Sequence, residues 1–316
     1  MTIRPVDLPG APRPVYLGAV RYEAGELIAL EKVVPSDATR ARLRHADHGA
    51  DTLARSSRSA LELAQAAIEA CLASDARPRE AIDAVVLASN GVDAAGGLDL
   101  AWLGQSSRRL GLSRAAHYHV GMAGCAGFHW AARLAASLVA ADQCGSVLIV
   151  TFDKGEGALQ RLYGEDTEFP YLTGDAAAAC LVGGSPQGLD YRLQGKVVNV
   201  WDGEQAVRPS LDAEVGCIYE LLTTTCASAG LSMDDVDTFI TNNYSLDMSR
   251  LYCQIAGVGE AKAFTQTIAT HAHCFGSDNL INLHHAQKRL PLTAGQRAML
   301  FSAGPFQWGA CVLEKL

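Results

Sequence analysis

The sequence predicts an α/β protein in which one pattern of strands and helices occurs twice. Short apolar runs typical of buried strands alternate with longer segments whose apolar residues recur at helical spacing. Residues 146–152 are almost continuously apolar, as expected for a strand in a sheet that is covered on both faces. The alternation resumes after a boundary near residues 183–187. We therefore expect one half at residues 1–184 and a second at residues 185–316.

In the first half, Val85, Val86 and Leu87 form the centre of a short buried strand. The small residues at 173–184 suit a central strand on which helices pack closely. The predicted strands are residues 15–20, 81–89, 116–120, 146–152 and 173–184, and the predicted helices are residues 58–72, 98–110 and 129–141.

The second half shows the same alternation less regularly, and no simple sequence repeat supports the duplication. It rests on the order of the elements alone. The last two strands are joined by residues 303–307. The predicted strands are residues 191–200, 236–241, 298–302 and 308–313, and the predicted helices are residues 214–229, 245–255 and 280–286.

Composition places the chain among ordinary globular proteins. About half of its 316 residues are hydrophobic, but no uninterrupted apolar run approaches the roughly 20 residues of a membrane-spanning helix. Residues 1–5 lack the apolar core of a signal peptide. The net charge of −8 argues against a nucleic-acid partner, and nine cysteines without paired short spacings argue against disulfides and a metal site. We expect a cytoplasmic protein with no metal and no membrane contact.

Cys125 has the strongest features of a reactive residue. Small residues flank it on both sides, and it lies between the predicted strand at 116–120 and the predicted helix at 129–141. A sulfur at a helix N-terminus faces unpaired N–H groups and the positive end of the helix dipole, which favour the thiolate. The other cysteines are interpreted as small buried hydrophobic residues.

A thiolate nucleophile needs a base, and the base needs an orienting group. His273 precedes a glycine turn, and Asp278 follows five residues later at a predicted helix N-cap, so the carboxylate can fold back onto the imidazole. Two alternatives stay open: Asp278 acts only as a helix cap, or His271 replaces His273. The remaining histidines near these segments are interpreted as packing or surface residues, or lack an adjacent carboxylate: His117, His119, His129, His284 and His285.

Three motifs occur in a familiar order. They are Cys125 with the following Ala-Gly-Phe, the small-residue strand at 174–179, and the segment at 303–309. Together they resemble the A-C-A-G-F, G-D-G-A-G-A and G-G-G-F-x-W-G motifs of β-ketoacyl-ACP synthase III, a branch of the thiolase superfamily. The resemblance extends from about residue 14 to the end of the chain. It implies the duplicated, five-layered αβαβα thiolase fold, usually as a homodimer. It also implies an acyl thioester on Cys125 and an oxyanion hole formed by the N–H groups of Cys125 and Gly304.

Two departures from the family bear on the reaction. Condensing members carry a histidine in P-H-Q-A-N and an asparagine in G-N-T-S, which stabilise the enolate formed by decarboxylation. Here Asn242 takes the histidine position and Ser277 takes the asparagine position. A subgroup that forms esters or transfers acyl groups in polyketide and related secondary-metabolite pathways resembles this chain instead. Its histidine and aspartate lie on one C-terminal loop, as do His273 and Asp278.

The resemblance favours an acyltransferase with Cys125, His273 and Asp278 as its catalytic set and Asn242 lining the site. It would move an acyl group to an acceptor hydroxyl, amine or thiol. Two alternatives remain. In the first, Asn242 and His273 have exchanged the places of the two family residues around Cys125, and the enzyme still catalyses decarboxylative condensation. In the second, the chain is a catalytically degenerate partner in a heterodimer.

The expected donor is an acyl group on the phosphopantetheine of an acyl carrier protein or on coenzyme A, with no tightly bound cofactor. The R-T-G-I-x-x-R segment that helps to bind coenzyme A in many members is not visible between residues 34 and 60, which favours the carrier protein. Arg40, Arg44 and Arg250 are the candidate contacts to this acidic partner.

Overall fold

The computed structural model describes residues 13–90, 99–155, 160–165, 170–201, 211–304 and 306–316. Residues 1–5, for which the sequence predicts no signal peptide, lie outside the described residues. No described helix is both long enough and apolar enough to cross a membrane.

The first half contributes five neighbouring strands to a 10-stranded sheet, in the order β5-β4-β6-β9-β1. β4 is parallel to β5 and β6, whereas β9 is antiparallel to β6 and β1. The strands are β1 (Tyr16–Ala24), β4 (Ala84–Ala88), β5 (Ala116–Val120), β6 (Ser146–Asp153) and β9 (Ala176–Gly183), and the helices are α2 (Ala60–Ala73), α4 (Leu100–Leu110) and α5 (Gly127–Ala140).

The second half repeats this arrangement as β12-β11-β13-β14-β10. β11 is parallel to β12 and β13, and β14 is antiparallel to β13 and β10. The halves join where β1 pairs with β10 over a short antiparallel stretch. The strands are β10 (Tyr191–Trp201), β11 (Thr238–Ile240), β12 (Ala263–Phe264), β13 (Arg297–Ala303) and β14 (Gln307–Lys315), and the helices are α6 (Leu211–Ser228), α7 (Leu246–Ala256) and α9 (Asp278–Arg289).

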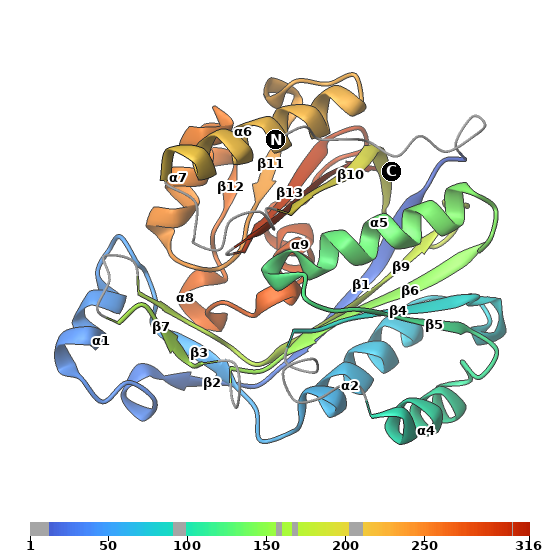
Figure 1. Cartoon of the computed structure of the whole chain (residues 1–316), viewed down its shortest axis with the longest axis horizontal. Coiled ribbons are helices and arrows are strands. Elements are labelled where there is room, and N and C mark those ends of the chain that lie inside the picture. The colour runs from blue at the N-terminus through green and yellow to red at the C-terminus, as the bar shows by residue number, and fades with distance from the viewer. Residues whose placement is uncertain (1–12, 91–98, 156–159, 166–169, 202–210, 305) are drawn as a thin grey trace.

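Helices form three layers around the two sets of strands (Figure 1). α5 packs on β4, β6 and β9 and also on β10 and β14, and α9 contacts β1, β9, β11 and β13. These two helices therefore form the middle layer. α2 and α4 cover the outer face of the first set of strands, and α6 and α7 cover that of the second. The predicted five-layered αβαβα fold is confirmed.

The central strands are apolar because both of their faces are covered. Every residue of β4, β6 and β9 is buried. The alanines of β9 leave room for helices on either side, and α2 contacts one face while α5 contacts the other. Most predicted elements therefore lie within a few residues of the observed ones.

Shorter elements were not predicted, because they carry no extended apolar pattern. The helix α1 (Asp37–Arg44) begins after Ser36, whose hydroxyl accepts from the N–H of Thr39. The other elements are β2 (Glu26–Ala29), β3 (Thr52–Arg55), β7 (Leu162–Tyr163), β8 (Tyr171–Leu172) and α8 (Ile268–His271), with single 3₁₀ turns at η1 (Leu30–Lys32), η2 (Arg79–Ala81), η3 (Gly124–Ala126), η4 (Met233–Asp235), η5 (Glu260–Lys262) and η6 (Phe275–Ser277).

The covered sheet makes a direct prediction about stability. Leu148 lies fully buried on β6, whereas Leu27 on β2 is 50% exposed. We expect Leu148→Ala to lower the free energy of unfolding by about 2–5 kcal/mol, because it removes buried methyl groups and leaves a cavity. Leu27→Ala is the matched control and should change it by about 0.5 kcal/mol or less. Reversible denaturant unfolding measures both, and equal losses would contradict the covered-sheet arrangement.

Candidate active site

Cys125 lies where the chain turns from β5 into α5. It is the middle residue of η3, which leads directly into α5. The turn is sharp, since Met122 and Gly124 both have positive φ angles, 53° and 52°. As the sequence predicts, the sulfur belongs to a strand-to-helix turn at the start of a helix. Backbone N–H groups there lack acceptors within the helix.

His273 lies on the loop between α8 and η6, and its backbone is anchored to the first half. Its N–H donates to the carbonyl of Leu172 at 2.9 Å, and its carbonyl accepts from the N–H of Gly174 at 2.9 Å. Ala272 and Phe275 on this loop adopt positive φ angles of 58° and 53°. Such angles cost free energy in residues other than glycine, so the surrounding contacts must hold this loop in place.

The structure brings Cys125, His273 and Asp278 into one hydrogen-bonded chain. The sulfur of Cys125 lies 3.0 Å from Nε2 of His273. On the other side of the ring, Nδ1 lies 2.5 Å from Oδ2 of Asp278. His273 and Asp278 are fully buried, and Cys125 is 7% exposed. This is the geometry of a nucleophile, a base and a group that orients the base.

Asp278 does not act merely as a helix cap. The N-cap of α9 is Ser277, so the predicted cap position is wrong by one residue, and Asp278 is the first helical residue. Its Oδ1 accepts from the N–H of Cys274 at 2.7 Å, and its Oδ2 accepts from the N–H of Asn243 at 2.8 Å. With the bond to His273, these contacts fix both carboxylate oxygens and leave the imidazole oriented by a rigid anion.

The charged form of His273 is favoured in this environment. Burial by itself lowers the pKa of the imidazole, but the Cys125 sulfur and the Asp278 carboxylate outweigh it and raise the pKa to about 10. A raised pKa means that the imidazolium persists below about pH 10. Near neutral pH the ring therefore carries a proton beside the sulfur of Cys125.

Tyr244 packs against the imidazole and was not singled out from the sequence. Its ring centroid lies 4.2 Å from that of His273, and its hydroxyl donates to the carbonyl of Ala303 at 2.6 Å. Tyr171 meets both rings edge to face. Burial and the nearby Cys125 sulfur raise the pKa of the Tyr244 hydroxyl, so this side chain stays neutral. One feature of the sequence could have pointed to Tyr244: it lies in the segment that departs from the family's P-H-Q-A-N motif, at the position of the small alanine.

The two predicted oxyanion donors differ in their surroundings. A Cβ at Gly304 would lie 3.3 Å from the backbone nitrogen of Cys125, so this glycine keeps the space in front of that N–H open. The N–H of Gly304 itself donates to the carbonyl of Gln307 at 2.7 Å. It is therefore paired within its own turn, whose residue 305 lies outside the described residues. Gly304 as an oxyanion donor stays a prediction that requires this bond to open.

Asn242 and Ser277, the residues at the two altered family positions, are tied into the protein. The side-chain oxygen of Asn242 accepts from the N–H of Ala303 at 2.9 Å, and its amide nitrogen lies 3.4 Å from Oδ2 of Asp278. The hydroxyl of Ser277 lies 2.9 Å from that of Thr151. Asn242 thus connects the carboxylate to the C-terminal hairpin, and its role toward a substrate stays a prediction.

Five other histidines form their hydrogen bonds with groups other than Cys125. Nδ1 of His271 lies 2.8 Å from the Thr270 hydroxyl, so this residue does not replace His273. His129 is fully buried with Nε2 3.1 Å from the carbonyl of Leu300, and burial lowers its pKa to about 3. Three more have other partners: His117 with the Ser107 hydroxyl, His284 with the carbonyl of Val20, and His285 with the Tyr22 hydroxyl.

Seven of the other eight cysteines are buried, as their interpretation as packing residues requires, whereas Cys217 is partly buried. All nine are free, and burial raises the pKa of several of their thiols, to about 12 in Cys71 and Cys311. Within the described part of the chain, no group of three or more His, Cys, Asp or Glu side chains is arranged to hold a metal ion.

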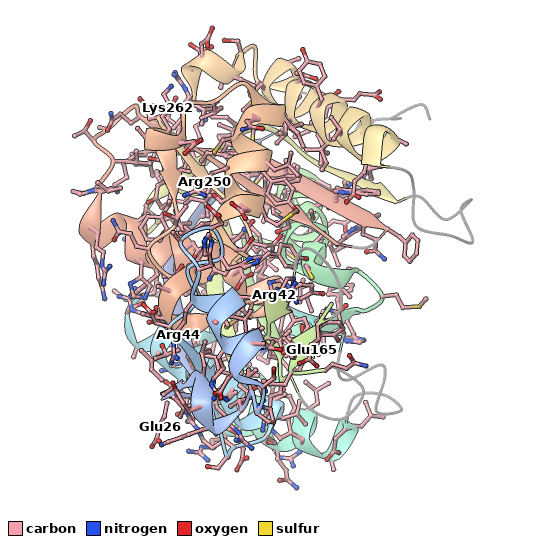
Figure 2. All side chains as sticks on the ribbon, turned by 90° about the vertical axis from the view of Figure 1, so that its left-hand side faces the viewer. Glu26, Arg42, Arg44, Glu165, Arg250 and Lys262 are labelled. Carbon is pink, nitrogen blue, oxygen red and sulfur yellow. The ribbon has the colours of Figure 1, made fainter. Side chains whose placement is uncertain are left out.

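Arg44 and Arg250 lie on one face of the molecule (Figure 2), and all three candidate carrier contacts are ion-paired within the chain. Arg40 pairs with Asp37, and Arg44 lies 2.6 Å from Glu31. Arg250 lies 3.1 Å from Asp47 and 3.0 Å from Asp247. Figure 2 shows Arg44 and Arg250 on this face, with acidic side chains such as Glu26 and Glu165 nearby. The face is therefore of mixed charge.

The layered fold with a cysteine, a histidine and a carboxylate at its centre defines an acyl-transferring enzyme of the thiolase type. Two family models match the sequence. The model for 3-oxoacyl-[acyl-carrier-protein] synthase III matches residues 122–196, and the model for its C-terminal part matches residues 226–315. The chain belongs to this synthase III-like branch of the thiolase superfamily, so the resemblance in the sequence is confirmed. The sequence has no significant match among curated proteins.

Solved structures of the same fold cover almost the whole chain. ChlB3, described as an acyltransferase, has a TM-score of 0.79 at 20% identity, over 96% of this chain and 98% of that one. The 3-oxoacyl-[acyl-carrier-protein] synthase III of Aquifex aeolicus has a TM-score of 0.78 at 16% identity, over 95% and 99%. The priming β-ketosynthase of the R1128 polyketide pathway has a TM-score of 0.74 at 18% identity, over 96% and 98%. At these identities the likeness establishes the fold.

The raised pKa of His273 can be tested directly. We expect its imidazole to stay protonated in nitrogen-labelled NMR spectra up to about pH 10. In Asp278→Asn the midpoint should fall by about 1–3 pH units, because the neighbouring negative charge is lost. His129 is the internal control, since it is buried without a carboxylate and should stay neutral in both proteins. A midpoint that is unchanged in the variant would contradict the role of Asp278.

Proposed function

We propose that this protein is an acyltransferase that carries its acyl group as a thioester on Cys125. The hydrogen-bonded chain from Cys125 through His273 to Asp278 is the observation that carries the proposal. Acyl transfer needs an activated nucleophile and a base that can deprotonate an acceptor, and this set of residues supplies both. The acceptor is a small molecule with a hydroxyl, amine or thiol group.

The first step is attack of the Cys125 thiolate on the thioester carbonyl of the donor. The N–H of Cys125 stabilises the resulting oxyanion, and collapse of the intermediate breaks the bond to the carrier sulfur. The departing thiolate takes the proton from Nε2 of His273. The imidazole, now neutral, then removes a proton from the acceptor, which attacks the acyl-enzyme and releases Cys125. Asp278 stabilises each imidazolium state through its 2.5 Å bond to Nδ1.

The surroundings of Cys125 favour transfer over decarboxylative condensation. Asn242 replaces the family histidine, and its amide is engaged with Asp278 and Ala303. Ser277 replaces the family asparagine, and its hydroxyl is engaged with Thr151. The similarity to ChlB3, described as an acyltransferase, also supports acyl transfer. The similarity to a polyketide priming synthase supports a role in a polyketide or related secondary-metabolite pathway.

The proposed donor is an acyl group on the phosphopantetheine of an acyl carrier protein or on coenzyme A, with no tightly bound cofactor. Arg40, Arg44 and Arg250 remain the proposed carrier contacts, and docking there exchanges intramolecular carboxylates for those of the partner. We further propose a cytoplasmic homodimer. β5 is the end strand of the sheet, and Tyr118 on it and Met122 beyond it are 37% and 81% exposed, which suits pairing with a second copy.

Acyl loading tests the nucleophile and the base. Incubation with acyl carrier protein charged with short acyl groups should add one acyl mass to the wild-type protein, and Cys125→Ala should abolish it. His273→Ala should slow loading by about 10²–10⁴-fold, the usual contribution of a general acid–base group. Mass spectrometry gives the adduct, and thermal unfolding shows whether each variant folds. Cys311→Ala is the control, since Cys311 is buried away from the triad. Unchanged loading in folded His273→Ala would remove this residue as the base.

Malonyl-loaded carrier protein separates transfer from condensation. We expect the malonyl group to reach Cys125 or an acceptor without release of carbon dioxide, because the two family groups that stabilise the enolate are replaced by Asn242 and Ser277. Carbon dioxide is measured with a carboxyl-labelled malonyl donor. Its release by the wild-type protein but not by Cys125→Ala would establish condensation instead.

A further inference from the structure

The peptide group that joins Gly124 to Cys125 has an unusual environment. Its carbonyl oxygen accepts two hydrogen bonds, from the N–H of Gly127 within η3 and from the side-chain amide of Asn90 at 3.0 Å. The N–H of the same peptide group belongs to Cys125. Whatever binds the Gly124 carbonyl therefore acts on the N–H of Cys125, the proposed oxyanion donor.

Asn90 is held in place by a buried carboxylate. Its backbone N–H donates to Oδ1 of Asp153 at 2.8 Å, and its side-chain nitrogen lies 3.3 Å from Oδ2. Asp153 is 2% exposed and also accepts from the Ser89 hydroxyl at 3.0 Å. These residues follow β4 and end β6, whose parallel pairing brings them together. The amide of Asn90 is thereby aimed at Gly124 without needing to reorient during the reaction.

Hydrogen bonding at a peptide oxygen strengthens the opposite end of the group as a donor. Accepting two bonds draws electrons toward the Gly124 oxygen, which polarises the Cys125 N–H. This matters more here because the N–H of Gly304 is paired with Gln307. Gly304 also leaves the space beside the nitrogen of Cys125 free of a side chain. The oxyanion thus depends chiefly on one polarised N–H.

We propose that Asn90 is a positioning residue that orients and polarises the Gly124–Cys125 peptide group so that the N–H of Cys125 binds the oxyanion. The inference rests on the proposed acyl-enzyme at Cys125. Asn90 touches neither the substrate nor the sulfur, and it acts only through this peptide group.

The test compares the carbonyl stretch of the acyl-enzyme in matched variants. Wild-type protein, Asn90→Ala, Asn90→Leu and Ser89→Ala are acylated with carbonyl-¹³C acetyl, butyryl and octanoyl thioesters of pantetheine. Difference infrared spectra report the labelled band, and mass spectrometry gives the loading rate. Ser89→Ala is the control because it also removes a bond to Asp153 but leaves Asn90 and Gly124 joined.

We expect the labelled band to move to higher wavenumber in both Asn90 variants, because a weaker N–H polarises the carbonyl less. Loading should slow by roughly three- to tenfold, since the donor is weakened rather than removed. Ser89→Ala should keep the wild-type band. A general loss of stability reduces the amount of acyl-enzyme but does not move its band.

Three outcomes overturn the inference. An unshifted band in acylated Asn90→Ala or Asn90→Leu shows that the amide does not act on this peptide group. An equal shift in Ser89→Ala shows that Asp153, and not the bond from Asn90 to Gly124, sets the band. Failure of the wild-type protein to take up any of the acyl groups contradicts the acyl-enzyme itself. Loading with an unshifted band contradicts only the role of Asn90.

Discussion

The buried carboxylate of Asp278 is the interaction on which the rest of the site depends. An anion removed from water is costly unless hydrogen-bond donors surround it. Here the donors come from two segments of the chain: the imidazole of His273 and the N–H of Cys274 on one loop, and the N–H of Asn243 after β11. Satisfying this charge therefore fixes the histidine loop against the second half of the sheet. The same contacts decide the tautomer and charge of the imidazole that faces Cys125. The hydrogen bonds that stabilise the buried carboxylate are therefore also the ones that orient the imidazole.

The duplicated topology explains why these groups meet. Cys125 precedes α5 and Asp278 begins α9, and the two helices hold equivalent places after the end strands β5 and β12 of the two halves. Both form the middle layer, so their N-terminal turns η3 and η6 lie against each other at the centre of the molecule. The N-terminal ends of two helices, where the backbone dipole is positive, thus converge near the sulfur of Cys125. A fold that repeats one unit thus places two helix starts at a single site, one beside Cys125 and one that carries Asp278.

Sequence patterns predicted the layers and the central residues but not the contacts between distant segments. Residues 146–152 could be assigned as a strand because a strand covered on both faces must be continuously apolar. His273 and Asp278 could be paired because five residues of one loop allow the contact. The ion pair of Arg250 with Asp47 could not be foreseen, since Asp47 lies more than 200 positions away in the chain. Tyr244 carries a local signal only in its motif position, which does not show that it packs on His273. Asn90, which binds the Gly124 carbonyl, carries no local signal, because only the folded chain brings it to its partner.

The charged imidazole and the polar groups around it give a physical reason to expect acyl transfer rather than decarboxylative condensation. In the proposed transfer, the imidazole alternates between accepting and giving a proton, and the adjacent carboxylate stabilises its charged state. An enolate formed by decarboxylation needs donors fixed around a second thioester. The groups at the corresponding family positions, Asn242 and Ser277, instead direct their polar atoms to Asp278, Ala303 and Thr151. The Asn242 N–H that faces Asp278 and the Ser277 hydroxyl would have to leave these partners before either could donate to an enolate. Hydrogen bonds within the protein thus occupy the side chains on which condensation would depend.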